Sequence, residues 1–147
     1  MDKSVIVGSF LNRIREYEFA NMYDEERTDI VDEYLMTSVA AFDSMCRTKI
    51  LDSYDAEKGT FDFGMSAVQE REAVKIISLG MVVEWLAGFK NNQDNLELLL
   101  NTRDFTTYAP HNIQNAVRNT YESADKEYAK KMREFTFQYG DLTRLHI

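Results

Sequence analysis

The sequence predicts an all-α protein, a single-domain bundle of four to five helices with one extended, strand-like loop near residues 52–65. Two observations lead to this fold class. Apolar residues recur at steps of three and four over long stretches, which is the period of an amphipathic helix. The 147 residues include one proline and six glycines, too few for a linker-rich or collagen-like chain. A chain of this length can bury roughly 68–70% of its unfolded surface, enough for a core without disulfides or metals.

Two helices are predicted in the first third of the chain, at about residues 5–17 and 25–50. Asp24 is a candidate N-cap of the second helix, and Glu25 and Glu26 fall in its first turn, where the helix dipole favours acids. The apolar positions of this helix form one stripe: Ile30, Val31, Tyr34, Leu35, Val39, Phe42, Met45, Cys46 and Ile50.

Residues 52–65 break the helical period. Gly59 and Gly64 bracket the alternating Phe61 and Phe63, which predicts an extended segment.

The next helix is predicted to begin after Ser66, because Ser66 and Gln69 have the spacing of a capping box. Residues 76–89 are apolar around most of the helix circumference, so this helix should be the central and most buried one. Gly80 in its middle costs up to about 1 kcal/mol against alanine, which indicates that a neighbouring helix approaches closely there.

A short helix is predicted around Leu96, Leu98, Leu99 and Leu100, and Pro110 is expected to open the last helix. That helix has one sustained stripe: Ile113, Val117, Tyr121, Ala124, Tyr128, Met132, Phe135 and Tyr139. Gly140 is a candidate C-terminal cap. The predicted domain therefore covers residues 1–140, and residues 141–147 form a tail.

Negative charge is concentrated near the start of the second helix. Acids outnumber bases 25 to 17, and residues 16–33 hold eight acids against Arg27 alone. We call six of these acids the acidic face: Asp24, Glu25, Glu26, Asp29, Asp32 and Glu33. Two interpretations stay open, a solvated helix face and an electronegative surface that repels nucleic acid or meets a basic partner. A free-standing nucleic-acid binder would instead carry a basic patch.

The single cysteine and the lengths of the apolar runs indicate the cellular compartment in which the chain is made. Cys46 is the single cysteine and cannot form an internal disulfide, so it is interpreted as a small buried hydrophobe. No stretch approaches the roughly 18 consecutive apolar residues of a membrane span, and the apolar run at residues 5–7 is too short for a signal peptide. We expect synthesis in a reducing cytoplasm and no membrane partner.

Residue patterns for catalysis are missing. The two histidines, His111 and His146, have no glutamate three residues before them, and no paired cysteines occur. The sequence also has no nucleophile elbow, phosphate-binding glycine loop or dinucleotide fingerprint. We therefore expect a protein that is not an enzyme and has no catalytic residues, no metal and no cofactor.

One enzymatic alternative stays open, an all-α nucleotide pyrophosphohydrolase that holds magnesium through acids at helical spacing. The acidic face has such spacing, and carboxylates are suitable magnesium ligands. The second acid pair that this chemistry needs would be Glu122 and Asp125, some 90 residues downstream and flanked by lysines.

Large side chains favour an assembly subunit. The chain has eight tyrosines, nine phenylalanines, one tryptophan and seven methionines, and one helical bundle has difficulty burying all of them. These residue types are favoured at protein interfaces.

Three segments together resemble a known family. They are residues 80–86 (Gly-Met-Val-Val-Glu-Trp-Leu), residues 101–113 (Asn-Thr-Arg-Asp-Phe-Thr-Thr-Tyr-Ala-Pro-His-Asn-Ile), and the run from 118–122 (Arg-Asn-Thr-Tyr-Glu) to 137–142 (Phe-Gln-Tyr-Gly-Asp-Leu). The long aromatic-rich helix ending in Tyr-Gly-Asp-Leu is similar to that of small head–tail connector, or neck adaptor, proteins from tailed phages of Gram-positive bacteria. The resemblance covers about residues 10–142 and is clearest from residue 75 onward.

The resemblance implies a structural virion protein, made in the host cytoplasm, which forms a ring of about twelve copies under the portal and joins capsid to tail. Its partners would be further copies of itself, the portal protein, and a neighbouring neck or tail protein. DNA would pass through the lumen without specific binding, and the acidic face could line that lumen. Contacts in such families come from loops and chain ends, here Phe61, Phe63, Asp141, Leu142, Leu145 and Ile147.

A further alternative is an acidic helical interaction module, either a DNA mimic or an inhibitor. A DNA mimic should spread its carboxylates in two rows along one face, whereas here they cluster in residues 16–33.

Overall fold

The computed structural model describes residues 1–17, 28–91 and 110–139, with side chains described at 1–17, 29–88 and 115–139. Its helices are α1 (Lys3–Ile14), α2 (Thr28–Cys46), the short 3₁₀ helix η2 (Leu51–Ser53), α3 (Ala67–Asn91) and α5 (Pro110–Tyr139). No sheet forms within these residues, so the all-α prediction is confirmed. The predicted short helix at 96–100, the Gly140 cap and the tail lie outside the described residues.

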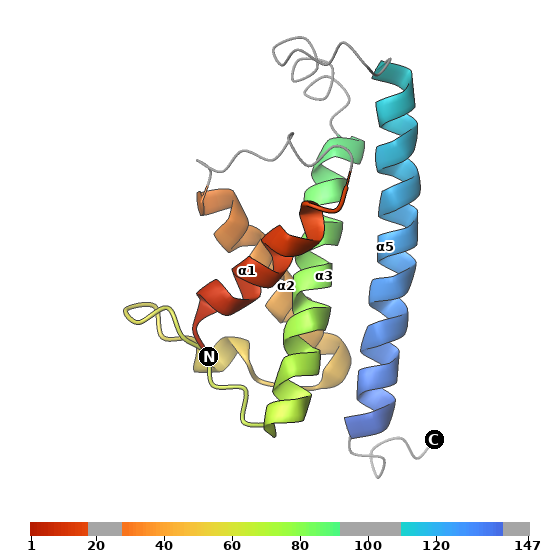
Figure 1. Cartoon of the computed structure of the whole chain (residues 1–147). Helices are drawn as coiled ribbons and strands as arrows, with labels where there is room; N and C mark the ends of the chain where they lie inside the picture. The colour runs from red at the N-terminus through yellow and green to blue at the C-terminus, as the bar shows by residue number, and fades with distance from the viewer. Residues whose placement is uncertain (18–27, 92–109, 140–147) are drawn as a thin grey trace.

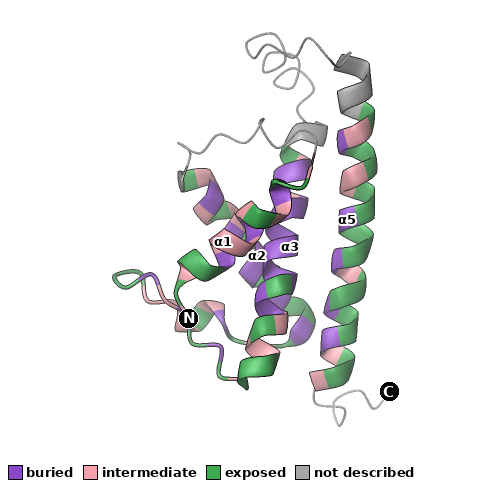
Figure 2. Cartoon of the chain, in the orientation of Figure 1, coloured by how far each residue is buried: buried purple, intermediate pink, exposed green. Residues whose placement is uncertain are grey.

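Helix α3 is the centre of the bundle. Helices α1 and α2 cross it, and the long α5 runs beside it (Figure 1). Buried positions follow α3 along its length and only one side of α5 (Figure 2). Ile77, Met81 and Leu86 of α3 have no exposed surface, as expected for a helix that is apolar around most of its circumference.

The capping box at the start of α3 is confirmed. The Ser66 backbone N–H donates to Gln69 Oε1 at 3.1 Å, and the Gln69 backbone N–H donates to Ser66 Oγ at 3.3 Å. The two residues satisfy each other's free donors, so the helix begins at Ala67.

Gly80 lies where α2 and α5 both close on α3, as its position in the sequence predicts. A Cβ atom at Gly80 would be 2.7 Å from Tyr128 Cζ and 2.8 Å from the Tyr128 hydroxyl oxygen, and closer still to Ser38 Oγ. Only a residue without a side chain fits this crossing.

The end of α2 differs from the prediction. The helix ends at Cys46 and not near Ile50, and Arg47 takes a left-handed conformation with φ of 57°. The Asp43 carboxylate accepts the backbone N–H groups of Ile50 and Leu51, each at 2.9 Å, and the Thr48 hydroxyl. These bonds turn the chain so that Ile50 enters the core from outside the helix.

The segment at 52–65 is extended only in part: it begins within η2, turns at residues 56–59, and pairs with the start of the chain through residues 59–61. The Met1 amino group donates to the Phe61 carbonyl at 2.9 Å, and the Phe61 N–H donates back to the Met1 carbonyl at 2.8 Å. Two isolated bridges form, from Thr60 to Asp2 and from Thr60 to Asp55, without extending into a sheet. The loop thereby fixes the start of α1, whose N-cap Asp2 accepts from the Ser4 N–H at 2.9 Å.

Helix α5 opens at Pro110 as predicted, and it presents the predicted stripe to the core. The members with described side chains are buried or partly buried: Val117, Tyr121, Ala124, Tyr128, Met132, Phe135 and Tyr139. The ring centroids of Phe135 and Phe42 are 5.1 Å apart, edge to face, and join α5 to α2.

Candidate interaction surfaces

Two large apolar side chains are exposed where α2 and α5 end. Phe137 on α5 is 74% exposed and Met45 on α2 is 47% exposed, and we call them the exposed pair. The Thr136 hydroxyl is 3.4 Å from the Met45 carbonyl oxygen, so the end of α2 lies against the turn of α5 that carries Phe137. The exposure of the Met45 side chain contradicts the prediction that this residue belongs to the buried stripe of the helix.

Phe137 differs sharply from Phe135, two residues earlier on the same helix. Two residues turn an α-helix by about 200°, so the ring of one faces the core and that of the other faces away. Phe135 is 5% exposed and packs on Phe42, whereas Phe137 shares a shallow surface hollow with Arg133. The sequence alone indicates this difference, because Met132, Phe135 and Tyr139 follow the three-and-four spacing of the buried stripe and Phe137 does not.

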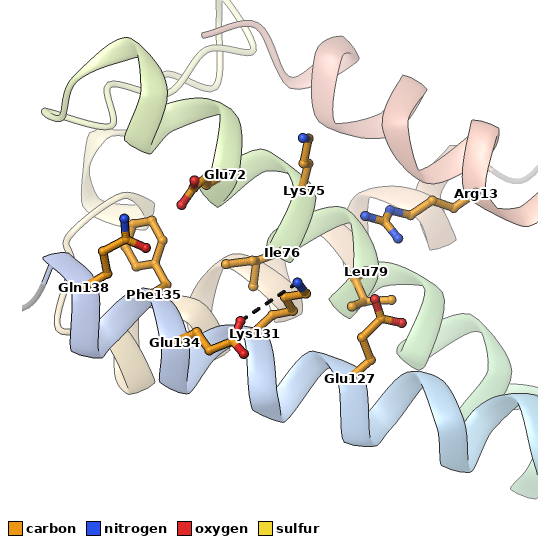
Figure 3. Close-up of a pocket in the computed structure, with 10 residues that line it drawn as sticks. All are labelled: Arg13, Glu72, Lys75, Ile76, Leu79, Glu127, Lys131, Glu134, Phe135 and Gln138. Carbon is orange, nitrogen blue, oxygen red and sulfur yellow. Dashed lines mark ion pairs between the residues drawn. The ribbon is translucent and has the colours of Figure 1, made fainter.

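A groove of about 390 Å³ lies between α1, α3 and α5. Its floor is apolar, formed by Ile76 and Leu79 of α3 and Phe135 of α5. Figure 3 shows Phe135 and Gln138 at one end, Ile76 in the middle, and Leu79 with Arg13 and Glu127 at the other end. We call this the α1–α3–α5 groove.

Charged side chains of both signs form the rim of the groove. Three are basic and three are acidic: Arg13, Lys75 and Lys131, against Glu72, Glu127 and Glu134. The ion pair that Figure 3 marks joins Lys131 to Glu134 at 3.9 Å. A rim of balanced charge over an apolar floor suits a short peptide segment better than a phosphate or a bare anion.

Tyr139, the last described residue, packs against the groove residue Phe135. Its ring centroid is 4.9 Å from that of Phe135 on the groove floor. Partial desolvation, together with the neighbouring Glu72 carboxylate, raises the pKa of the Tyr139 hydroxyl.

The described half of the acidic face lies on the first turns of α2. Asp29 and Glu33 are exposed, while Asp32 is 3.3 Å from the ammonium group of Lys3 on α1. Partial burial lowers the pKa of Lys3, but the hydrogen bond and charge of Asp32 outweigh it and the pKa is raised overall. Asp24, Glu25 and Glu26 lie outside the described residues.

The two carboxylates proposed as a second magnesium pair, Glu122 and Asp125, are exposed on α5. Among the described residues, no group of three or more His, Cys, Asp or Glu side chains converges as a metal site. Side chains of His111 and His146 are not among those described.

Phe61 and Phe63, expected at an interface, lie in the core of the subunit. They are 3% and 6% exposed, and the Phe61 ring packs 4.7 Å from that of Tyr54 and 6.4 Å from that of Phe63. Alternate residues of an extended segment face the same side, so both rings turn inward while Asp62 between them is exposed. Their rings are therefore not surface groups. Asp141, Leu142, Leu145 and Ile147 lie outside the described residues.

Cys46 is buried, as predicted. Its Sγ lies 3.7 Å from the Met132 carbonyl oxygen, and burial raises the pKa of the thiol. A protonated, enclosed thiol is a packing group and a poor nucleophile.

Comparisons of the chain with protein-family models, with curated proteins and with solved structures find no match. Helices in the described part of the chain are all too short or too polar to cross a membrane.

Proposed function

We propose that this chain is a structural, non-enzymatic subunit, a head–tail connector or neck adaptor that assembles as a ring and joins a phage capsid to its tail. The observation that carries the proposal is the exposed pair, Met45 and Phe137, at the end of the bundle from which residues 140–147 continue. A phenylalanine exposed on 74% of its surface stabilises a contact by about 1.5–3 kcal/mol when a partner covers it.

The packing of the bundle supports a rigid building block. One cluster of buried side chains joins α1, α2, α3 and α5, and α3 packs against each of the other three. A ring needs subunits that keep their shape, because a heterologous contact closes only if every copy makes it at the same angle.

Of the segments that carry the family resemblance, residues 80–86 lie in the core, whereas residues 118–122 and 137–139 are exposed or half-buried on α5. Residues 80–86 are in the part of α3 that α2 and α5 approach, and residues 118–122 and 137–139 are on α5. The resemblance therefore concerns the scaffold and the end of α5, and it supports the portal and a neighbouring neck or tail protein as partners.

Location in the virion and contact with passing DNA are parts of the same proposal. Asp29 and Glu33 are exposed carboxylates on α2 that a lumen could present to DNA, which would then slide without binding. The tail residues Asp141, Leu142, Leu145 and Ile147 are proposed to contact a neighbouring copy or the portal.

Light scattering with a candidate portal protein tests the proposal through Phe137→Ser. The change leaves the fold intact because the ring touches little of the subunit, and it abolishes ring assembly. Val68→Ser is the matched control, since Val68 is another exposed large apolar residue, at 53%, but lies at the start of α3. Equal assembly of wild type and Phe137→Ser would show that the exposed pair is not an interface.

Deleting residues 141–147 tests the tail separately. We expect unchanged helical content by circular dichroism and loss of assembly on the portal. A truncated chain that still assembles would remove the tail from the interface.

A further inference from the structure

We propose that copies of this chain meet by placing the outer face of α5 in one subunit against the outer face of α2 in the next. The inference rests on the proposed function and names the two surfaces that form the contact between copies. In this arrangement the exposed carboxylates of α2, Asp29 and Glu33, meet the neighbouring copy and not the lumen.

The outer face of α5 is basic and ends in an aromatic ring. This exposed side of the helix lies opposite its buried positions (Figure 2). At spacings of four, three and four residues it carries Lys126, Lys130, Arg133 and Phe137. Lys126 and Arg133 form no ion pair within the described residues, and Lys130 has only a 3.9 Å contact with the exposed Glu134. Most of this positive charge is therefore available to a partner.

The outer face of α2 complements α5 in charge and in side-chain size. Asp29 and Glu33 are exposed and form no ion pair within the described residues, whereas the nearby Asp32 pairs with Lys3. Farther along the same side of the helix, the exposed side chains are small: Thr37, Ala40, Ala41 and Ser44. Small side chains let a helix of another copy approach closely, so a large ring can lie between the two helices.

Equal spacings on the two helices define a register. The two lysines at 126 and 130 are four residues apart, as are the two acids at 29 and 33. Phe137 follows the second lysine by seven residues, and Ala40 follows the second acid by seven, which is about 10 Å along either helix. Helices that run in the same direction therefore bring both lysines against both acids while the Phe137 ring lies against Ala40. Exposed ion pairs add little affinity, but they select the orientation and register.

A second copy, joined through α2, is the occupant that the charges favour. Two α5 faces brought together would oppose their own basic side chains, so α5 is a poor partner for itself. The α2 and α5 faces are both exposed, so they do not cover each other within one subunit. Each copy then offers one face and receives the other, which is the heterologous contact that builds rings. A net charge of −8 disfavours nucleic acid as the partner of the chain.

Charge reversal in the full chain tests the proposal, with assembly on a candidate portal protein followed by light scattering. The α5 variant carries Lys126→Glu and Lys130→Glu, and the α2 variant carries Asp29→Lys and Glu33→Lys. Circular dichroism checks that each variant keeps its helical content.

Each reversed variant alone should assemble at least about tenfold more weakly than wild type, because like charges then face each other at every contact. An equimolar mixture of the two variants should assemble again, since alternating copies restore an attractive contact on both sides of each subunit. The matched control is Lys49→Glu with Lys58→Glu, which changes the net charge as the α5 variant does at exposed positions outside both faces. It should assemble like wild type.

The outcomes separate this contact from the connector function itself. If wild type assembles and either reversed variant alone assembles equally well, or if the mixture fails to assemble, the contact lies elsewhere and the connector proposal stands. A wild type that does not assemble on the portal contradicts both proposals. Assembly that requires DNA, and that only the α5 variant loses, would assign the basic side chains to phosphates and overturn the contact with α2.

A swap of charges within one chain tests the register. Lys130→Glu combined with Glu33→Lys should recover assembly. Lys130→Glu combined with Glu57→Lys has the same net charge but changes an exposed acid outside both faces, and it should not recover. Equal assembly of the two combinations would contradict the pairing of positions 130 and 33.

Discussion

Replacing Gly80 by alanine should destabilise the protein, although the same change inside an ordinary helix is stabilising. Helix propensity favours Gly80→Ala by up to about 1 kcal/mol. At this crossing, however, the added Cβ would stand 2.7 Å from Tyr128 Cζ and closer still to Ser38 Oγ, and ordinary carbon contacts need about 3.5 Å or more.

The neighbours of Gly80 have little freedom to move. Tyr128 is 8% exposed, and Ser38 is 2% exposed and donates its hydroxyl to the Ile77 carbonyl at 2.6 Å. Overpacking of such a site typically costs about 1–3 kcal/mol, and losing the buried hydrogen bond adds about 0.5–1.5 kcal/mol. After a propensity gain of about 1 kcal/mol is subtracted, we expect the free energy of unfolding to fall by about 0.5–3.5 kcal/mol.

Gly88→Ala is the matched control on the same helix. A Cβ there would meet only the Tyr34 hydroxyl at 3.8 Å, an ordinary contact, so propensity should dominate and raise the free energy of unfolding by up to about 1 kcal/mol. Urea unfolding followed by far-UV circular dichroism measures both variants against wild type. If Gly80→Ala were as stable as Gly88→Ala, helices α2 and α5 could not close on Gly80 as described.

Three further predictions concern single side chains. Asp43→Ala should lower the free energy of unfolding by about 1–3 kcal/mol, because two backbone N–H groups lose their acceptor. Asp43→Asn should lower it less, and urea unfolding of both variants measures the difference. In the same assay, Phe135→Ala should lower the free energy of unfolding by about 3–5 kcal/mol, and Phe137→Ala should lower it by less than about 0.5 kcal/mol. If the two variants lost similar amounts, the assignment of Phe135 to the inner face of α5 and of Phe137 to the outer face would be wrong. The Tyr128 hydroxyl has no hydrogen-bond partner among the described residues, and burial raises its pKa above the ordinary tyrosine value near 10. The stability that the neutral Tyr128 side chain contributes is therefore complete below about pH 10 and is lost as the pH rises further. Tyr128→Phe should therefore flatten the fall in stability above about pH 10, and an unchanged pH profile would contradict this.

Much of the fold could be predicted because the decisive signals are local. The three-and-four spacing that buries Val117, Ala124 and Met132 on α5 is set by the helix itself, so no tertiary information is needed. The same holds for the capping box of Ser66 and Gln69, whose two hydrogen bonds span three residues. The Gly80 prediction succeeded because a glycine inside an otherwise well-formed helix needs a steric reason.

The predictions that failed depend on contacts that the spacing of apolar residues does not show. Phe61 and Phe63 turn inward because the segment pairs with Met1, sixty residues away, and no spacing rule shows which face of an isolated extended segment is covered. Ile50 reaches the core through the backbone bonds of Asp43 and not through a longer helix. The groove needs residues from three helices, so it exists only once α1, α3 and α5 are packed.

The central claim is that this chain works by assembly, and its stoichiometry on a portal protein is the most direct measurement. Native mass spectrometry or light scattering of the mixture should show a ring-sized species, and a ring of about twelve 17.1 kDa chains would add about 205 kDa to the portal. A 17.1 kDa monomer that ignores the portal at micromolar concentration would contradict the claim. Nucleotide hydrolysis by that monomer, lost on Asp29→Ala, would instead establish the magnesium-dependent alternative.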